Sequence, residues 1–354
     1  MSDDQDLLLP DYPAVFGSGV IGVCDICGTR QAVIVLQKER FKLCVLDFLN
    51  KSWLTTKSKP GAPLPPYRSD RIWFDTATSK SGHSSAILLT PTKAVRHPTI
   101  LITPDVYGVT TVLLDAGIRL AKEGYEVMIP EVASTSGIGF PEHLATRTGA
   151  YLAGGVPMQS PRTRKLVLYF QDALAYLRTR PMVDPDKAAV FGVGFGGSLA
   201  LGVAAEEQKL TALAVAYPMP VRPAGVVELV TAPVLFVDAG RDAASRHSRR
   251  AFESRATQPG SPVEYADFPG ARRHFLSRDV GAYDLAMAEA AWGRILSFLK
   301  GRLQPPPPKP PAPPKTVAPP ASTPIASVAP ATPKPTPVPP ASAGGTPSPP
   351  AAPG

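Results

Sequence analysis

Short apolar runs alternate with amphipathic stretches over most of this chain. Runs such as residues 99–103 and 125–129 end at turn residues and are too short for helices, so they predict buried strands. The stretches between them place apolar residues three or four positions apart, the spacing of a helix with one buried face. This alternation predicts an α/β fold, a mostly parallel sheet with helices on both sides.

The same pattern assigns each element to a place in the chain. Residues 71–76 and 84–90 predict a hairpin, and single strands are expected at 99–103, 125–129, 188–193, 210–216, 233–237 and 263–267. Helices are expected at 110–123, 162–178 and 281–303. The second helix should bury Leu166, Phe170, Leu174 and Leu177, and the third Leu285, Trp292, Ile295 and Leu299. Residues 131–160 are rich in Gly, Ser and Thr and predict a loop with a short helix near Glu142.

Two proline-rich stretches bound this domain. Residues 59–67 are a linker by composition, and about half of the chain's 43 prolines lie in residues 304–354. This tail has almost no large apolar side chains, so it should be disordered and partly polyproline II. It predicts a spacer, or a ligand for a proline-binding protein. We therefore divide the chain into a module at 1–58, the linker, a domain at 68–303 and the tail.

Charge and hydropathy exclude several classes of protein. The net charge of +8 is distributed as −1 over residues 1–58, +6 over 59–303 and +3 over the tail, without the concentrated basic face of a nucleic-acid binder. The one dense basic run, residues 241–250, is interpreted as the solvated face of a helix. No apolar run is long enough to span a bilayer, and the acidic first eleven residues do not resemble a signal peptide. We expect a cytoplasmic protein without membrane contact.

All three cysteines lie in the N-terminal module, which in a reducing compartment favours a metal over a disulfide. Cys24 and Cys27 form a C-x-x-C-G knuckle, and a predicted β-hairpin separates them from Cys44 and Asp47. This order resembles a treble-clef zinc finger, with Asp47 in place of the usual last cysteine. The resemblance implies a structural Zn²⁺ bound by these four residues. The alternative is a finger that has lost its metal.

The most informative pattern is a glycine-rich turn after the predicted strand that ends at Val193. Gly192, Val193, Phe195 and Gly196 match the G-x-nucleophile-x-G turn of α/β-hydrolases, in which a strand turns sharply into a helix. The position of the nucleophile holds Gly194, which has no side chain. The glycines alone also suggest a dinucleotide-binding loop, but no acidic residue is placed to bind a ribose.

Residues 68–303 resemble the dienelactone hydrolase family of α/β-hydrolases. Four patches carry the likeness: D-V-Y-G-V at 105–109, the glycine-rich turn, Asp242 after a predicted strand, and His274 followed by phenylalanine. The order of nucleophile position, acid and histidine is the one expected for this fold. The resemblance implies an α/β-hydrolase fold that acts on a small ester, lactone or carboxylate, without an organic cofactor.

The resemblance also implies a role for each matching residue. In the family a cysteine or serine attacks the carbonyl carbon, a histidine transfers the proton and an aspartate orients the imidazole. His274 and Asp242 match the histidine and the aspartate, while Gly194 leaves the nucleophile position vacant.

The remaining matches concern the oxyanion and the pocket. The backbone N–H groups of Val106 and Phe195 correspond to the two donors that bind the oxyanion. Asp105 corresponds to the family's additional acidic residue, one methylene shorter than the usual glutamate, and Tyr107 to its aromatic neighbour.

The sequence therefore predicts a catalytically impaired homologue that binds a small carbonyl or carboxylate ligand or acts as a scaffold. The main alternative is an active ester or lactone hydrolase that uses water, or another nucleophile such as Ser198, with His274 and Asp242. A third hypothesis makes the finger a nucleic-acid- or protein-binding module with the large domain as passenger. The near-neutral charge of residues 1–58 argues against nucleic acid.

We predict that the chain binds one zinc ion and that Cys24→Ser releases it, because a three-ligand remainder binds the metal far more weakly. Metal analysis of the purified protein checks this, with Ser52→Ala from the same module as the control. A Cys24→Ser protein that keeps its full zinc content would refute the proposed ligand set.

Overall fold

A computed structural model describes residues 66–79, 81–105, 108–132, 154–256, 262–278 and 282–304, together with five short strands between residues 14 and 43. Backbone contacts group Met1–Pro306 apart from Pro307–Gly354, the proline-rich segment. Residues 59–65 of the predicted linker, residues 305–354 of the predicted tail and the four predicted zinc ligands Cys24, Cys27, Cys44 and Asp47 lie outside the described residues, as do Val106 and Tyr107. Tyr67, the last residue of the predicted linker, instead begins the first strand of the large domain.

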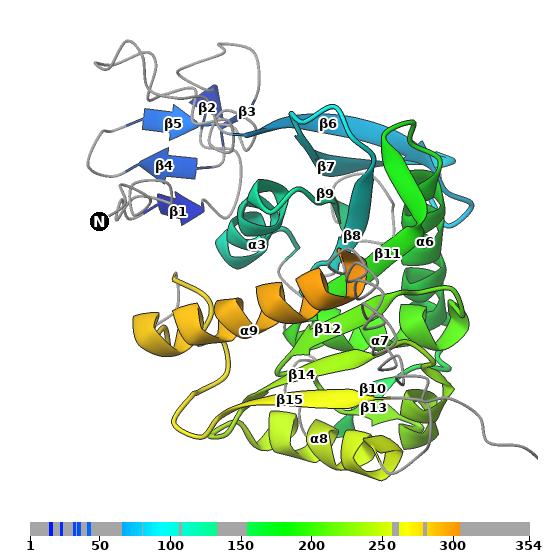
Figure 1. The fold of residues 1–354 in the computed structure, drawn as a ribbon, viewed down its shortest axis with the longest axis vertical. Coiled ribbons are helices and arrows are strands. Elements are labelled where there is room, and N and C mark those ends of the chain that lie inside the picture. The colour runs from blue at the N-terminus through cyan, green and yellow to red at the C-terminus, as the bar shows by residue number, and fades with distance from the viewer. Residues whose placement is uncertain are drawn as a thin grey trace, which may run out of the picture. The chain divides into compact units, whose positions relative to one another are not determined.

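A single eight-stranded sheet organises the large domain (Figure 1). Its strands lie in the order β15-β14-β12-β11-β8-β9-β7-β6, and the six from β15 to β9 are parallel. Strands β7 and β6 continue the sheet antiparallel, as a hairpin. Their bounds are β6 (Tyr67–Asp75), β7 (His83–Pro91), β8 (His97–Thr103), β9 (Glu126–Pro130), β11 (Val183–Val193), β12 (Ala212–Ala216), β14 (Val234–Ala239) and β15 (Val263–Phe268).

Helices cover both faces of this sheet. On one face α3 (Thr111–Lys122) and α9 (Leu285–Leu303) pack against Ile102, Phe191 and Val237. On the other face α6 (Pro161–Arg178), α7 (Gly194–Glu206) and α8 (Ala243–Ala256) pack against residues such as Leu101, Val190 and Phe236. Because successive residues of a strand point to opposite faces, each central strand supplies both cores and carries a continuous run of small or apolar residues, such as 188–193 in β11. Figure 1 shows α9, in orange, crossing one face of the sheet.

The predicted elements are confirmed with small shifts in their bounds. The hairpin, the strands and the three predicted helices all form, and the sheet is mostly parallel with helices on both sides. Two short strands, β10 (Val156–Pro157) and β13 (Val221–Arg222), and the 3₁₀ helix η2 (Ala224–Leu229) were not predicted, because two-residue pairings leave no periodic pattern. Most of the predicted loop at 131–160, including Glu142, lies outside the described residues.

The predicted core face of α9 is wrong at one position. Trp292, Ile295 and Leu299 are buried, but Leu285 is 59% exposed. The helix begins at Leu285 after Asp284, whose side chain accepts the Met287 N–H as an N-cap. The first turn therefore carries Leu285 outside the part of the helix that packs on the sheet.

The short N-terminal strands fit the predicted hairpin. Strands β4 (Ile34–Leu36) and β5 (Phe41–Leu43) pair antiparallel, and β1 (Ala14–Phe16) pairs with β4. Strands β2 (Gly22–Val23) and β3 (Gln31–Ala32) pair on either side of the C-x-x-C knuckle. In the part of the chain that the structure describes, no helix has the combined length and apolar character needed to cross a membrane.

A buried arginine links α3 to α9. Arg119 is 8% exposed; its Nε donates to Asp115, and its two terminal nitrogens donate to Glu289 at 2.8 and 2.6 Å. The guanidinium also lies 5.4 Å from the ring centroid of Trp292. Asp115 is itself 5% exposed, so the arginine compensates a buried negative charge.

We predict that Arg119→Met destabilises the domain by roughly 3–5 kcal/mol, because it leaves the Asp115 carboxylate buried without its partner. Chemical denaturation measures this change. Adding Asp115→Asn should recover part of the loss, and Arg68→Met, which removes an exposed ion pair with Asp70, should change stability by less than about 1 kcal/mol. Equal losses for the Arg119 and Arg68 variants would contradict the assignment.

Candidate active site

The glycine-rich turn joins β11 directly to α7, as the elbow of a hydrolase does. Gly194 has φ +55°, a left-handed conformation that favours glycine. A Cβ atom on Gly192 would lie 2.5 Å from both the Gly196 carbonyl oxygen and the Thr103 hydroxyl. The Thr103 hydroxyl in turn donates to the Gly196 carbonyl oxygen at 2.7 Å. The flanking glycines therefore allow a close approach between the elbow and β8.

The carboxylate of Asp105 lies in the space that a side chain at residue 194 would enter. A Cβ atom built on Gly194 would be 2.7 Å from Oδ2 of Asp105 and 3.1 Å from Oδ1. The backbone N–H of Phe195, one of the predicted oxyanion donors, donates to Oδ1 at 3.0 Å. Asp105 is only 4% exposed. The protein's own carboxylate thus occupies the anion-binding position of the elbow.

The sheet topology explains why Asp105 reaches this position. It follows β8 by two residues, and β8 is the parallel neighbour of β11. The carboxyl ends of parallel neighbours lie at the same edge of the sheet, so the residue after β8 meets the turn after β11. The amide of Phe195 belongs to the first turn of α7, where unpaired N–H groups and the helix dipole favour an anion.

His274 lies in the loop after β15 and takes a left-handed backbone conformation, with φ +66°. Its ring meets that of Tyr217 edge-on, at 5.8 Å between centroids. Burial lowers the pKa of His274 below its ordinary value, while the charges of Asp105 and, to a smaller extent, Asp242 act in the opposite direction. The imidazole is therefore neutral at about pH 7 and can act as a base.

Asp242 is bound by groups other than His274. Its Oδ1 accepts the N–H of Ala244 at the start of α8, and Oδ2 forms an ion pair with Nε of Arg273 at 3.0 Å. Among the described residues, no hydrogen bond or ion pair joins Asp242 to His274. The charge of Asp242, the predicted acid, thus acts on His274, the predicted base. The carboxylate of Asp242 itself pairs with Arg273.

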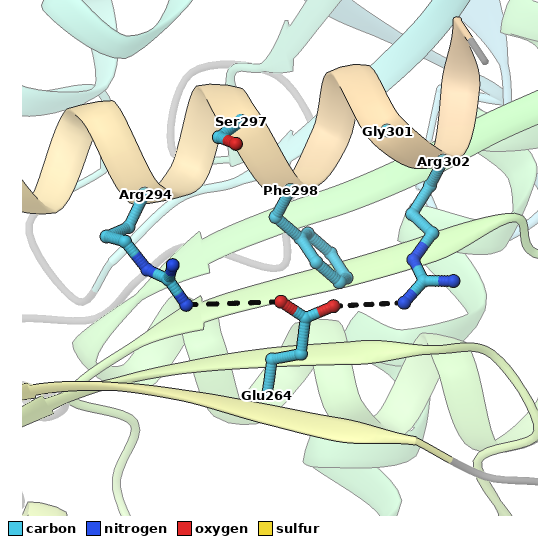
Figure 2. A pocket seen from close by; sticks show the side chains of 6 residues that line it. All are labelled: Glu264, Arg294, Ser297, Phe298, Gly301 and Arg302. Carbon is cyan, nitrogen blue, oxygen red and sulfur yellow. Dashed lines mark hydrogen bonds and ion pairs between the residues drawn. The ribbon is translucent and has the colours of Figure 1, made fainter. Parts of the chain in front are cut away.

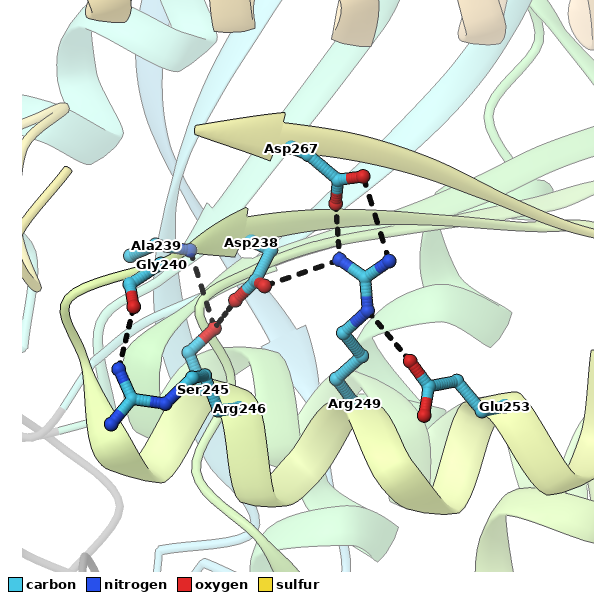
Figure 3. A network of polar contacts seen from close by, with 8 residues as sticks. All are labelled: Asp238, Ala239, Gly240, Ser245, Arg246, Arg249, Glu253 and Asp267. Atoms are coloured by element: carbon cyan, nitrogen blue, oxygen red, sulfur yellow. Dashed lines mark hydrogen bonds and ion pairs between the residues drawn. The ribbon is translucent and has the colours of Figure 1, made fainter. Parts of the chain in front are cut away.

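A polar network joins α8 to β14 and β15, on either side of the turn in which Asp242 follows β14 (Figure 3). Arg249 of α8 pairs with Asp238 on β14, with Asp267 on β15 and with Glu253 one helical turn away. The hydroxyl of Ser245 donates to Asp238 at 2.6 Å. The network therefore ties the beginning of α8 to the ends of both strands. It also refines the interpretation of the basic run, which is exposed at Arg246 and Arg250 but half-buried and ion-paired at Arg249.

Two residues of the site were not predicted from the sequence. Tyr217 follows β12, is fully buried with φ +38°, and burial raises the pKa of its phenol. Arg273 donates to the Tyr217 carbonyl oxygen at 3.1 Å in addition to its pair with Asp242. Arg273 directly precedes His274 in the sequence. This position could have indicated the pairing with Asp242, because a cation next to the base competes with the base for the neighbouring acid.

Ser198, considered as a substitute nucleophile, is fully buried in α7. Its hydroxyl donates to the Met219 carbonyl oxygen at 2.8 Å. The hydroxyl of Ser198 is thus already hydrogen-bonded to the backbone.

A small hollow of about 180 Å³ lies elsewhere, between β15 and α9 (Figure 2). Glu264 at its base accepts from Arg302 at 2.9 Å and faces Arg294 at 4.0 Å. No elbow residue lines it. Over the described ranges, no group of three or more His, Cys, Asp or Glu side chains is arranged to bind a metal.

We predict that Gly194→Ala destabilises the domain by more than Gly82→Ala, because both positions have positive φ but only residue 194 meets the Asp105 carboxylate. Backbone strain should cost each variant about 1–2 kcal/mol, and the contact should add roughly 1–3 kcal/mol at residue 194. In an Asp105→Ala background the added cost at residue 194 should disappear. Denaturation of the four variants measures it, and an unchanged cost in that background would show that the carboxylate lies elsewhere.

Comparisons with known proteins concern the fold and the family of this chain. A protein of Bradyrhizobium sp named "Probable 2-oxo-3-(5-oxofuran-2-ylidene)propanoate lactonase" is 26% identical over 242 residues, which are 65% of this chain and 94% of that protein. A crystal structure of a dienelactone hydrolase-like promiscuous phosphotriesterase from metagenomic libraries shares the fold, with a TM-score of 0.53 at 17% identity over 67% of this chain and 99% of that one. The model of the Dienelactone hydrolase family matches residues 85–303. The chain therefore belongs to the dienelactone hydrolase family.

Proposed function

We propose that this chain is a dienelactone hydrolase family protein that has lost efficient hydrolysis of esters and lactones. The observation that carries the proposal is the carboxylate of Asp105 at the elbow, next to the vacant side-chain position of Gly194. Two requirements of the family's chemistry are affected together: no side chain at residue 194 can form an acyl intermediate, and the Phe195 N–H is engaged by Asp105.

The remaining groups do not compensate for both losses. The Ser198 hydroxyl is bound to backbone, and Asp242 pairs with Arg273. Water activated by His274 could still attack a carbonyl carbon, but the developing oxyanion would compete with Asp105 for the Phe195 N–H. Loss of one oxyanion donor alone costs roughly 10²–10³ in rate.

The site supports binding of a small neutral molecule better than binding of a carboxylate. An anionic ligand would stand beside Asp105, and like charges close together in a buried site repel strongly. Arg273, whose charge acts on His274, is engaged by Asp242. We therefore narrow the expected ligand to a small neutral carbonyl compound or another neutral molecule of that size.

An activated ester such as p-nitrophenyl acetate tests the loss of hydrolysis. The unmodified protein and its His274→Ala variant should hydrolyse the ester at equal rates and without a burst, because neither can form an acyl intermediate at residue 194. Turnover that exceeds background and disappears in His274→Ala would overturn the proposal.

A gain-of-function pair gives the complementary test. Gly194→Ser alone should react poorly with a fluorophosphonate probe, because the Asp105 carboxylate lies where the new side chain would be. Gly194→Ser with Asp105→Ala should react faster, since the second change vacates both the side-chain space and the Phe195 N–H. If neither variant reacts while circular dichroism shows that both are folded, the elbow is not a disarmed hydrolase site.

A further inference from the structure

Although residue 194 has no side chain, the hydrogen bond from Phe195 to Asp105 holds a carboxylate oxygen at the elbow. Oδ1 of Asp105 accepts the Phe195 N–H at 3.0 Å, and Oδ2 lies 2.7 Å from the position of a Cβ atom at residue 194. The oxygen is supplied from the end of β8 instead of from the elbow residue itself. A carboxylate is a recognised covalent nucleophile in enzymes.

The geometry separates two kinds of electrophile. Attack on a carbonyl carbon creates an oxyanion on the substrate, which would need the N–H that Asp105 holds. Attack on a saturated carbon that carries a leaving group creates no substrate oxyanion, so it does not need that N–H. The engaged donor is therefore an obstacle to the first reaction and not to the second.

We propose that Asp105 is a catalytic nucleophile toward small neutral alkylating molecules, such as primary alkyl halides, and that His274 completes their hydrolysis. This activity goes beyond the loss of ester hydrolysis proposed above and rests on the same occupied elbow. In the first step a lone pair of Oδ2 forms a bond to the saturated carbon, while the carbon–halogen bond breaks and its electron pair leaves with the halide. The product is an alkyl ester of Asp105.

In the second step water hydrolyses this ester. The water oxygen attacks Cγ of Asp105 while the imidazole of His274 takes one of its protons. The negative charge then develops on Oδ1, which already accepts the Phe195 N–H, so this donor stabilises the tetrahedral intermediate. The bond from Cγ to Oδ2 breaks, the alkoxide takes the proton from His274, and loss of the second water proton restores the carboxylate. The net reaction converts an alkyl halide and water into an alcohol, halide and a proton.

The surroundings of the two residues suit these roles. Asp105 is 4% exposed, so its carboxylate is poorly hydrated. Among the described residues, Asp105, Asp242 and Arg273 act electrostatically on His274, and Tyr217 packs against its ring. Burial keeps the imidazole neutral at about pH 7, and the second step should slow as the pH falls and the imidazole is protonated.

Trapping the ester tests the proposal. The full chain and its His274→Asn variant are incubated with 1-bromopropane, and peptides are mapped by mass spectrometry. Asparagine is chosen because it tolerates the left-handed backbone at residue 274. His274→Asn should accumulate one propyl group on the peptide that contains Asp105, whereas the unmodified protein should release propanol and keep no adduct. His274→Gln provides a second variant in case the first is unstable.

Two controls make the result specific. Asp105→Asn in the His274→Asn background keeps an oxygen acceptor for Phe195 and should abolish the adduct, and labelling of the exposed Asp75 measures unspecific alkylation.

A single turnover of the unmodified protein in ¹⁸O-water should place ¹⁸O in the Asp105 carboxylate. Absence of the adduct in both His274 variants, or equal labelling of Asp105 and Asp75, would overturn the proposal. The ester assay has a separate readout, so failure of one proposal does not imply failure of the other.

Discussion

The hydrogen bond from the Phe195 N–H to the Asp105 carboxylate is the interaction on which the site depends. It joins the ends of two neighbouring parallel strands, β8 and β11, at the first turn of α7. Such a turn presents unpaired N–H groups and favours an anion. Here a side chain of the same chain supplies that anion. The elbow is therefore occupied from within, and any ligand must share the site with a buried negative charge.

The rest of the elbow is built as in a working hydrolase. Gly192 and Gly196 allow the turn to pass close to β8, Thr103 binds the turn through its hydroxyl, and Gly194 keeps the left-handed backbone of a nucleophile position. In the function that we propose, Gly194 stands at the position of the family's cysteine or serine, so the attacking atom is absent while this backbone is kept. The shorter side chain of Asp105, compared with the glutamate usual in the family, still reaches the vacated space.

Sequence periodicity was sufficient for the sheet and its helices, because buried parallel strands and amphipathic helices leave regular patterns. It failed for Leu285, since spacing alone does not show where a helix extends past the sheet that it covers. At the site, the sequence gives the order of Gly194, Asp242 and His274, but it does not predict which side chains pair with one another. The pairing of Asp242 with Arg273, and the contact of Asp105 with Phe195, depend on a few ångströms of loop geometry that no sequence spacing encodes.

The separation of Asp242 from His274 changes how the site is understood. In a family member with a complete triad the acid orients the imidazole. In this chain the electrostatic effect of Asp105 on His274 exceeds that of Asp242, which is bound to Arg273 and to the start of α8. The charge at the elbow therefore adds to that of Asp242 in raising the pKa of His274, against the effect of burial.

The amide resonance of Phe195 provides the most direct measurement of this central claim. A carboxylate acceptor moves an amide proton downfield, so the Phe195 resonance should shift upfield in Asp105→Ala while amides in the last turns of α7 stay unchanged. An identical Phe195 resonance in the two proteins would show that the carboxylate does not occupy the elbow and would contradict the account.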